Sequence, residues 1–314
     1  MENLESTSLA KDNRVGVFMF FLSVDEQKRR DHKETRTYYG VNVFKMREIL
    51  KLKTLQVTEI AGSNDLSLGM VSLRGEIIPL INLPLWLGYI LPKDYTSTYN
   101  ILICDFNHHK IGLVIGDPYR IEMKSWEDIE TSMAYQSGKE IKISNHTKTQ
   151  ETNDICFIVD IEQLLSEVMP EKEKQIQKDI ESINSDYSWI TKDAPILIAE
   201  DSKVARKHLE NLFKKINVKA EFFENGKYLL DRVKEIGISN LKNPVIITDL
   251  EMPIVSGHKV IQEIRKLNKN IPILVNSSMT SENNKREVLS LGATDFIGKT
   301  DSALIVSLLK KYVK

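Results

Sequence analysis

The residues of this chain that could do chemistry stand at the ends of short apolar runs in its second half. Glu200 and Asp201 follow one such run, and Asp249 follows a second. Lys299 ends a third run, and Ser277 ends a fourth with a hydroxyl group. Carboxylates bind a hard cation such as Mg²⁺ through oxygen, and a cation beside an aspartate and a lysine forms a site for a phosphoryl group. A single polar residue after a strand is ordinary, so this prediction depends on all of the positions occurring together.

These residues need a scaffold that brings the ends of the runs together. From residue 193 onward, short apolar runs alternate with amphipathic stretches of helical length, and Ser202 and Ser281 stand where helix N-caps are expected. Five such units predict a parallel α/β sheet covered on both faces, with ligands at the carboxyl ends of its strands. The expected strands are 195–200, 219–223, 244–249, 272–277 and 294–298, and the expected helices are 202–216, 225–237, 256–268, 281–291 and 302–313.

The first 165 residues have a different pattern. Short apolar runs follow one another across Gly-containing or polar turns, which favours an antiparallel barrel or a pair of barrels. Helical periodicity is confined to about 43–50 and 160–168. Residues 25–37 carry nine charges of both signs, which predicts a solvated hairpin tip. The expected strands are 15–24, 37–43, 69–73, 76–83, 99–106, 110–115 and 154–161.

A polar segment, 170–192, separates the two patterns and is expected to be a linker. Ile176, Ile180 and Ile183 recur in it at helical spacing, so part of it can form a helix with a thin apolar stripe. That stripe could dock on a neighbouring domain, or the segment could be a mostly solvated tether with partial helix. The abundance of Lys, Glu, Gln and Ser favours the tether.

Length and composition exclude several classes of protein. A chain of 314 residues is too long for one ordinary core, which predicts two domains. Its 43 Lys and Arg residues are balanced by 44 Asp and Glu residues, so no overall basic field favours nucleic acid. The polar N-terminus and the lack of any run of 18 apolar residues predict a cytoplasmic protein without membrane insertion. Cys104 and Cys156 lie in apolar runs and are expected to be buried free thiols.

Residues 193–314 resemble the receiver domains of two-component signalling. The resemblance rests on Glu200-Asp201-Ser202, on Thr248-Asp249-Leu-Glu-Met-Pro253 with Gly257, on Ser277, and on Phe296 with Lys299. It implies a flavodoxin-like, doubly wound (βα)5 fold in which Asp249 accepts a phosphoryl group from a kinase phosphohistidine. Two positions depart from the family pattern: Thr300 replaces the usual proline after the lysine, and Ser256 replaces a common aspartate. Neither departure removes a group that the chemistry needs.

The same resemblance implies a role for each of the other site residues. Lys299 would neutralise phosphoryl oxygens, Ser277 would contact the phosphoryl group as the switch hydroxyl, and Phe296 would be the switch aromatic. The implied Mg²⁺ ligands are Glu200, Asp201, Asp249 and the backbone carbonyl of Glu251.

The first half contains patterned strands whose order and spacing are similar to those of CheW, the coupling protein of bacterial chemotaxis, over residues 14–169. The similarity rests on Val17-Phe-Met-Phe-Phe-Leu, on 39–49, on 69–83 with its Ser72-Leu73-Arg74-Gly75, on 112–117 and on 158–165. It implies an all-β pair of five-stranded barrels that acts as a binding module without an active site. Arg74 and Gly75, on a turn between strands, are the expected partner contacts, and a buried salt bridge is the alternative role for Arg74.

A CheW-like domain followed by a receiver domain is the architecture of the CheV family of chemotaxis coupling proteins. The resemblance implies a phosphorylatable scaffold that links chemoreceptors to the histidine kinase CheA at membrane-anchored receptor arrays, without turnover of an external substrate. Two alternatives remain open. Phosphorylation of Asp249 could change the coupling and so produce adaptation, or the receiver could be a phosphate sink that drains CheA and is localised by the CheW-like domain.

Overall fold

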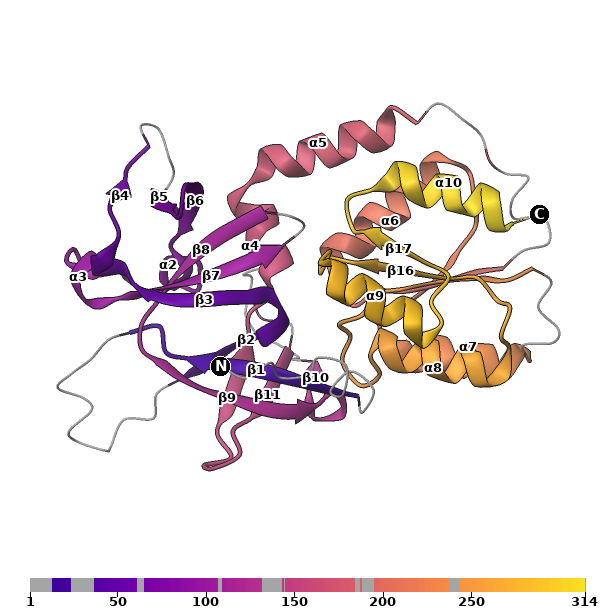
Figure 1. Cartoon of the computed structure of the whole chain (residues 1–314), viewed down its shortest axis with the longest axis horizontal. Helices are drawn as coiled ribbons and strands as arrows, with labels where there is room; N and C mark the ends of the chain where they lie inside the picture. The colour runs from indigo at the N-terminus through magenta and orange to yellow at the C-terminus, as the bar shows by residue number, and fades with distance from the viewer. Residues whose placement is uncertain are drawn as a thin grey trace. The chain divides into compact units, whose positions relative to one another are not determined.

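Figure 1 shows the computed structural model of the chain, which describes residues 13–23, 37–60, 65–106, 109–131, 143, 145–183, 187, 195–237 and 243–313. The polypeptide forms two compact units. One is an α/β unit that contains residues 165 onward with short segments at 13–15 and 125–129. The other is a β unit formed by residues 16–124 and 130–164.

The α/β unit is built on a five-stranded parallel sheet. The order across the sheet is β14-β13-β15-β16-β17, and all four pairings are parallel. This order defines the flavodoxin-like, doubly wound fold and confirms the sequence prediction. The strands are β13 (Ile196–Ala199), β14 (Glu221–Phe223), β15 (Val245–Thr248), β16 (Ile273–Ser277) and β17 (Asp295–Gly298).

Five helices follow the five strands and cover the sheet (Figure 1). Ser202 and Ser281 cap α6 and α9, since their Oγ atoms accept from the backbone N–H groups of Ala205 and Asn284 at 3.3 Å each. The side chains of α6 and α10 pack on one face of the sheet in a continuous apolar core. The helices are α6 (Lys203–Lys215), α7 (Gly226–Ile236), α8 (Gly257–Leu267), α9 (Glu282–Leu291) and α10 (Ser302–Tyr312).

The polar segment before the α/β sheet is not a solvated tether over its first part. Pro170–Glu181 forms helix α5, in which Ile180 is buried and Ile176 packs against the same apolar core as α6 and α10. Glu173 Oε2 lies 2.6 Å from His208 Nε2 on α6, and Asn211 Nδ2 donates to Gln177 Oε1 at 3.2 Å. The docked alternative is therefore the correct one, because the stripe Ile176, Ile180 and Ile183 packs against the apolar core that α6 and α10 share.

The β unit contains two six-stranded sheets, ordered β10-β11-β12-β2-β1-β9 and β3-β7-β8-β6-β5-β4. The expected all-β, CheW-like fold is confirmed as two sheets, but each sheet has six strands instead of the expected five, because the two-residue edge strands β4 and β10 are included. The first sheet consists of β1 (Arg14–Phe20), β2 (Tyr38–Asn42), β9 (Pro118–Ser125), β10 (Glu130–Thr131), β11 (Asn145–Lys148) and β12 (Ile155–Ile158). The second consists of β3 (Met46–Lys51), β4 (Val57–Thr58), β5 (Ser67–Leu73), β6 (Glu76–Ile81), β7 (Asn100–Phe106) and β8 (His109–Ile115).

One secondary-structure expectation in the β unit is wrong. The helix expected at 43–50 is a short 3-10 turn, Val43–Lys45, followed by strand β3. Strand β3 pairs antiparallel with β7, and this long-range pairing overrides the local helical periodicity. The helix expected at 160–168 is present as α4 (Ile161–Val168). Short helices α2 (Leu83–Trp86) and α3 (Tyr95–Thr98) link β6 to β7. The charged insertion lies outside the described residues, apart from Thr37.

Both cysteines are buried free thiols, as predicted. Burial raises the pKa of each thiol to about 12, so neither Cys104 nor Cys156 is a reactive thiolate near neutral pH. None of the helices in the described part of the chain is long and apolar enough to cross a membrane.

Candidate phosphoryl-accepting site

The polar residues at the strand ends converge at the carboxyl edge of the α/β sheet. Lys299 Nζ donates to Glu200 Oε1 at 2.8 Å and to Asp249 Oδ2 at 3.1 Å. At most 4% of each of these three side chains is exposed. Buried charges persist only when they are paired, so the lysine and the two carboxylates stabilise one another.

The backbone fixes the orientation of both buried carboxylates. The backbone N–H of Ser202 donates to Glu200 Oε1 at 3.2 Å, and that of Leu250 donates to Asp249 Oδ1 at 2.7 Å. The loop after Asp249 returns close to it, because a Cβ on Gly257 would lie 1.9 Å from the Asp249 carbonyl oxygen. Only glycine permits this close approach, which explains the glycine at the start of α8.

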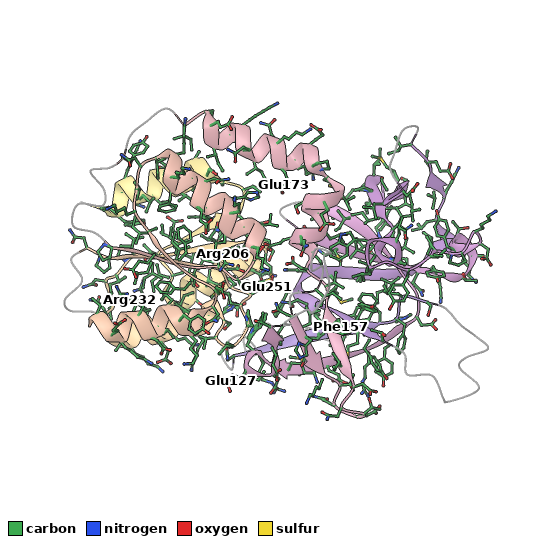
Figure 2. The ribbon with its side chains drawn as sticks, turned by 180° about the vertical axis from the view of Figure 1, so that it is seen from behind. Glu127, Phe157, Glu173, Arg206, Arg232 and Glu251 are labelled. Atoms are coloured by element: carbon green, nitrogen blue, oxygen red, sulfur yellow. The ribbon has the colours of Figure 1, made fainter. Side chains whose placement is uncertain are left out.

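Three carboxylates provide a donor set for a divalent cation. Glu200, Asp201 and Asp249 each offer one oxygen, and these oxygens lie within 4.8 Å of one another. This all-oxygen set fits Mg²⁺, which prefers carboxylate ligands and retains several waters. Asp201 is only partly buried, so the cluster has a side that solvent can reach. Glu251, labelled in Figure 2, is buried two residues after Asp249. The ligand role of its backbone carbonyl remains a prediction.

The two residues expected to act as a switch are both buried. Ser277 ends β16, and its Oγ accepts from the backbone N–H of Met279 at 3.2 Å. Phe296 lies in β17 with 7% of its surface exposed. The side chain of Phe296 is therefore buried in this structure. The switch roles of both residues remain predictions.

Sequence reasoning missed one polar residue close to this site. Asn276 lies within β16, one residue before Ser277, and is 1% exposed. The signal was an amide interrupting an otherwise apolar strand, Ile273-Leu-Val-Asn276. Buried polar side chains usually have hydrogen-bond partners, so a polar residue inside an apolar strand indicates a position with a structural or functional role.

Arg74 and Gly75 form the turn of the β5–β6 hairpin. Both have positive φ angles, +51° and +84°, a conformation that glycine adopts freely and arginine seldom does. The Arg74 guanidinium donates to both oxygens of Glu48, at 2.8 and 2.9 Å. With 74% of its side chain exposed, Arg74 is not part of a buried salt bridge, so that alternative is wrong. Beside the turn is a hollow of about 420 Å³ lined mostly by charged side chains, including Arg47, Glu76 and Lys110.

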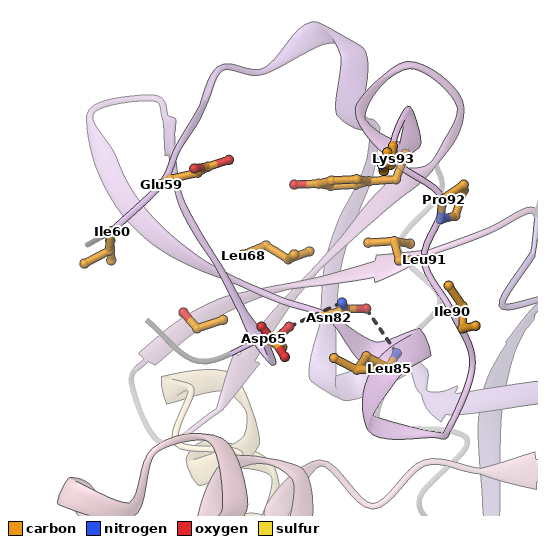
Figure 3. A pocket seen from close by; sticks show the side chains of 12 residues that line it. Glu59, Ile60, Asp65, Leu68, Asn82, Leu85, Ile90, Leu91, Pro92 and Lys93 are labelled. Atoms are coloured by element: carbon orange, nitrogen blue, oxygen red, sulfur yellow. Dashed lines mark hydrogen bonds between the residues drawn. The ribbon is translucent and has the colours of Figure 1, made fainter. Parts of the chain in front are cut away.

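A second hollow in the β unit, of about 450 Å³, was marked by no sequence motif (Figure 3). Asn82 fixes its floor by accepting from the Leu85 backbone N–H at 3.1 Å and donating to the Asp65 carbonyl at 3.4 Å. The rest of the lining is mixed, with apolar side chains such as Leu68 and Leu91 beside the charged side chains of Glu59 and Lys93. The hollow contains no cluster of nucleophilic or metal-binding groups among its described lining residues.

Comparisons with known proteins agree with this division of the chain. The CheW-like domain family matches residues 32–169, and the response regulator receiver domain family matches residues 196–310. Among solved structures, the scaffolding protein TtCheW from Thermoanaerobacter tengcongensis is 21% identical with a TM-score of 0.37, and covers 48% of this chain and 89% of its own. The Vibrio cholerae chemotaxis protein CheY4 is 24% identical with a TM-score of 0.33, and covers 38% of this chain and 98% of its own. The two family matches show that the chain is a CheW-like domain followed by a receiver domain.

Full-length relatives define the family. Chemotaxis protein CheV2 of Helicobacter pylori is 32% identical, over 98% of this chain and 97% of its own length. Chemotaxis protein CheV1 of the same organism is 31% identical, over 98% and 96%. This chain belongs to the CheV family of chemotaxis proteins.

Proposed function

We propose that this chain is a phosphorylatable adaptor that couples chemoreceptors to a histidine kinase of the CheA class. Asp249 accepts the phosphoryl group from the kinase phosphohistidine, and the CheW-like domain binds the kinase and the receptors. The observation that supports this proposal is the buried contact of Lys299 with Glu200 and Asp249 in a chain that also has a CheW-like domain. The chain turns over no external substrate and works at membrane-anchored receptor arrays.

The chemistry follows from the charges around Asp249. A carboxylate is a weak nucleophile, and an anionic phosphoryl group repels it unless the negative charge is neutralised. An Asp249 oxygen forms the new O–P bond while the N–P bond of the phosphohistidine breaks, and the imidazole nitrogen keeps the electron pair. Lys299, already beside Asp249 Oδ2, neutralises the phosphoryl oxygens. Mg²⁺ held by Glu200, Asp201, Asp249 and the Glu251 carbonyl supplies further positive charge when bound.

The product changes the electrostatics of a buried edge. The acyl phosphate carries a charge of about −1.5 to −2 on strong acceptor oxygens, in place of the single charge of the Asp249 carboxylate. Ser277 lies at this edge, and its hydroxyl proton is available for a phosphoryl oxygen because Oγ acts as an acceptor toward Met279. A shift of Ser277 and of the Phe296 ring then changes the outer surface of the receiver domain.

The partner surface of the CheW-like domain, proposed to span 14–169, includes Arg74 and Gly75. Arginine is enriched among residues that dominate binding energies, because its planar fork forms paired hydrogen bonds to carboxylates. Arg74 is presented on a hairpin turn and already forms such a fork with Glu48. An acidic group on the kinase or receptor can compete with Glu48 for this exposed guanidinium.

Adaptation is favoured over a pure phosphate sink by the docking of α5. The linker proposed for 170–192 leads from the CheW-like domain, and its helix packs on the core of the α/β unit through Ile176 and Ile180. A conformational change in the receiver, proposed to span 193–314, can therefore be transmitted to an ordered segment of the linker. A receiver that acted only as a phosphate sink would not need this contact.

Kinase activity in reconstituted receptor arrays tests the proposal. Wild-type protein should accept label from phosphorylated CheA, and its coupling of kinase to receptor should differ between the two phosphorylation states. The Asp249→Asn variant should couple in one fixed state and take no label. Label retained at the normal rate by Asp249→Asn would refute the acceptor assignment, whereas identical coupling in both states would leave only the sink.

A further inference from the structure

Asn276 lies on β16, the strand between β15, which leads to Asp249, and β17, which leads to Lys299. The register pairs Asn276 with Ile297 on β17, and it pairs Thr248 with Val275 between β15 and β16. Continuing that second pairing by one residue places Asp249 beside Asn276. Side chains alternate between the faces of a sheet, so Asn276 shares a face with Leu274 and Ile297, which belong to the core beneath α6 and α10.

Lys299 and its partners Glu200 and Asp249 lie on opposite sides of β16 in the sheet. Lys299 follows β17, at the edge of the sheet, and its ammonium contacts Asp249 at the end of β15. Strand β16 lies between them. Alternation continued from Ile297 puts Lys299 on the same face as Asn276, and β16, which carries the amide, lies between β17 and β15.

The amide itself is unused in this structure. Neither Oδ1 nor Nδ2 of Asn276 has a hydrogen-bond partner among the described residues, although the side chain is almost completely buried. A buried polar group without a partner is costly, and an apolar residue would suit the rest of the strand better. An amide in this place is explained if a second state of the site supplies its partner.

We propose that Asn276 is a positioning residue for the phosphorylated state. Transfer of a phosphoryl group turns one oxygen of Asp249 into the bridging atom of an acyl phosphate, which weakens the hold of Asp249 on the Lys299 ammonium. Asn276 Oδ1 then accepts a hydrogen bond from Lys299 Nζ and holds the ammonium against the phosphoryl oxygens. The inference rests on the proposed function, since it requires Asp249 to be the acceptor.

Full-length protein with Mg²⁺ and beryllofluoride, a stable mimic of the phosphoryl group, provides the test. Asn276→Val should bind beryllofluoride about tenfold more weakly than wild type, equivalent to the loss of one hydrogen bond of about 1.4 kcal/mol. Asn276→Thr, which has the shape of valine but keeps a hydroxyl, should recover part of the affinity. Affinity for Mg²⁺ alone should change less than twofold in either variant. Without ligands, Asn276→Val should unfold at a higher temperature than wild type, because the unpaired amide is gone.

Two further measurements separate the possible outcomes. Leu274→Val, on the same face and strand, should lower the unfolding temperature without changing beryllofluoride affinity. In wild-type protein, the side-chain amide NMR signals of Asn276 should shift on beryllofluoride binding, a readout that needs no variant. Equal affinities of wild type and Asn276→Val, or equal affinities of the Val and Thr variants, would overturn the inference, as would an unmoved amide signal or weakened Mg²⁺ binding. Failure of wild-type protein to bind beryllofluoride at all would instead refute the proposed function.

Discussion

The two candidate sites of this chain, the strand-end cluster of the α/β unit and the β5–β6 turn of the β unit, use charge in opposite ways. In the α/β unit, Glu200, Asp249 and Lys299 are buried and paired at one edge of a parallel sheet. In the β unit, Arg74 and Glu48 form an ion pair on a turn open to solvent. Buried charges interact strongly and impose one geometry, whereas exposed pairs are screened and contribute little to stability. The first arrangement is suited to chemistry within the chain, and the second to recognition of another surface.

The Asp249→Asn variant should separate the functions of the two units most clearly. This change removes the nucleophile, so transfer of label from phosphorylated CheA should fall below detection. Binding of unphosphorylated kinase to the CheW-like domain should remain within twofold of wild type, because Arg74 and its surroundings are untouched. A parallel loss of binding would contradict the division of labour between the units. Radiolabel transfer and a pull-down on the same preparations measure the two effects.

Lys299→Met should expose how strongly the buried cluster depends on its cation. The change leaves Glu200 and Asp249 buried side by side without the ammonium, and breaking a buried pair costs about 3–5 kcal/mol. Millimolar Mg²⁺ should restore part of that stability, because the cation replaces the lost positive charge. Thermal unfolding with and without Mg²⁺ checks this, with Lys310→Met on the surface of α10 as a charge-matched control. If Lys299→Met were as stable as wild type in the absence of Mg²⁺, the prediction would be wrong, and the repulsion between Glu200 and Asp249 would be small.

The α/β unit should also lose stability in mild acid through His258. Burial lowers the pKa of this imidazole to about 4, from 6.5. As the pH falls, the unfolded chain takes up the proton first, so stability that is complete above about pH 6.5 is lost toward pH 4, by about 3 kcal/mol. Denaturant unfolding of wild type and His258→Leu at pH 7 and pH 5 measures the difference. The expected result is a flatter pH dependence in the variant, and parallel pH profiles would show that other groups control the acid response.

The smallest effect on stability is expected at Arg74. An exposed pair such as Arg74–Glu48 contributes about 1 kcal/mol or less, so Arg74→Glu should leave the unfolding temperature nearly unchanged. If Arg74 is part of the partner surface as proposed, affinity for kinase or receptor should nevertheless fall about tenfold or more, because an arginine at the centre of an interface is replaced by the opposite charge. Arg232→Glu, the same charge change on α7 of the other unit, is the matched control. Equal binding by both variants would remove Arg74 from the partner surface.

Local pattern predicted the α/β unit well and the β unit less well. Three of the five strands of the α/β half are fully buried runs such as Val245–Thr248, which is followed by a capped amphipathic helix, so their signals are local. In the β unit, Met46–Lys51 has an irregular burial pattern, and only its pairing with β7 makes it a strand. Strand β9 was missed because it combines exposed Tyr119 and Ile121 with buried Glu122 and Lys124, which inverts the usual pattern.

The sequence by itself determined which groups are available for chemistry: carboxylates, a lysine and hydroxyls at the ends of apolar runs, and an arginine at a Gly-containing turn. Their register along parallel strands is a property of the chain, because strand ends meet at one edge of such a sheet. Only the tertiary structure decided that Lys299 contacts both Glu200 and Asp249, that α5 docks, and that the Asn276 amide has no partner among the described residues. Those outcomes depend on distances between residues tens of positions apart, which no local periodicity encodes.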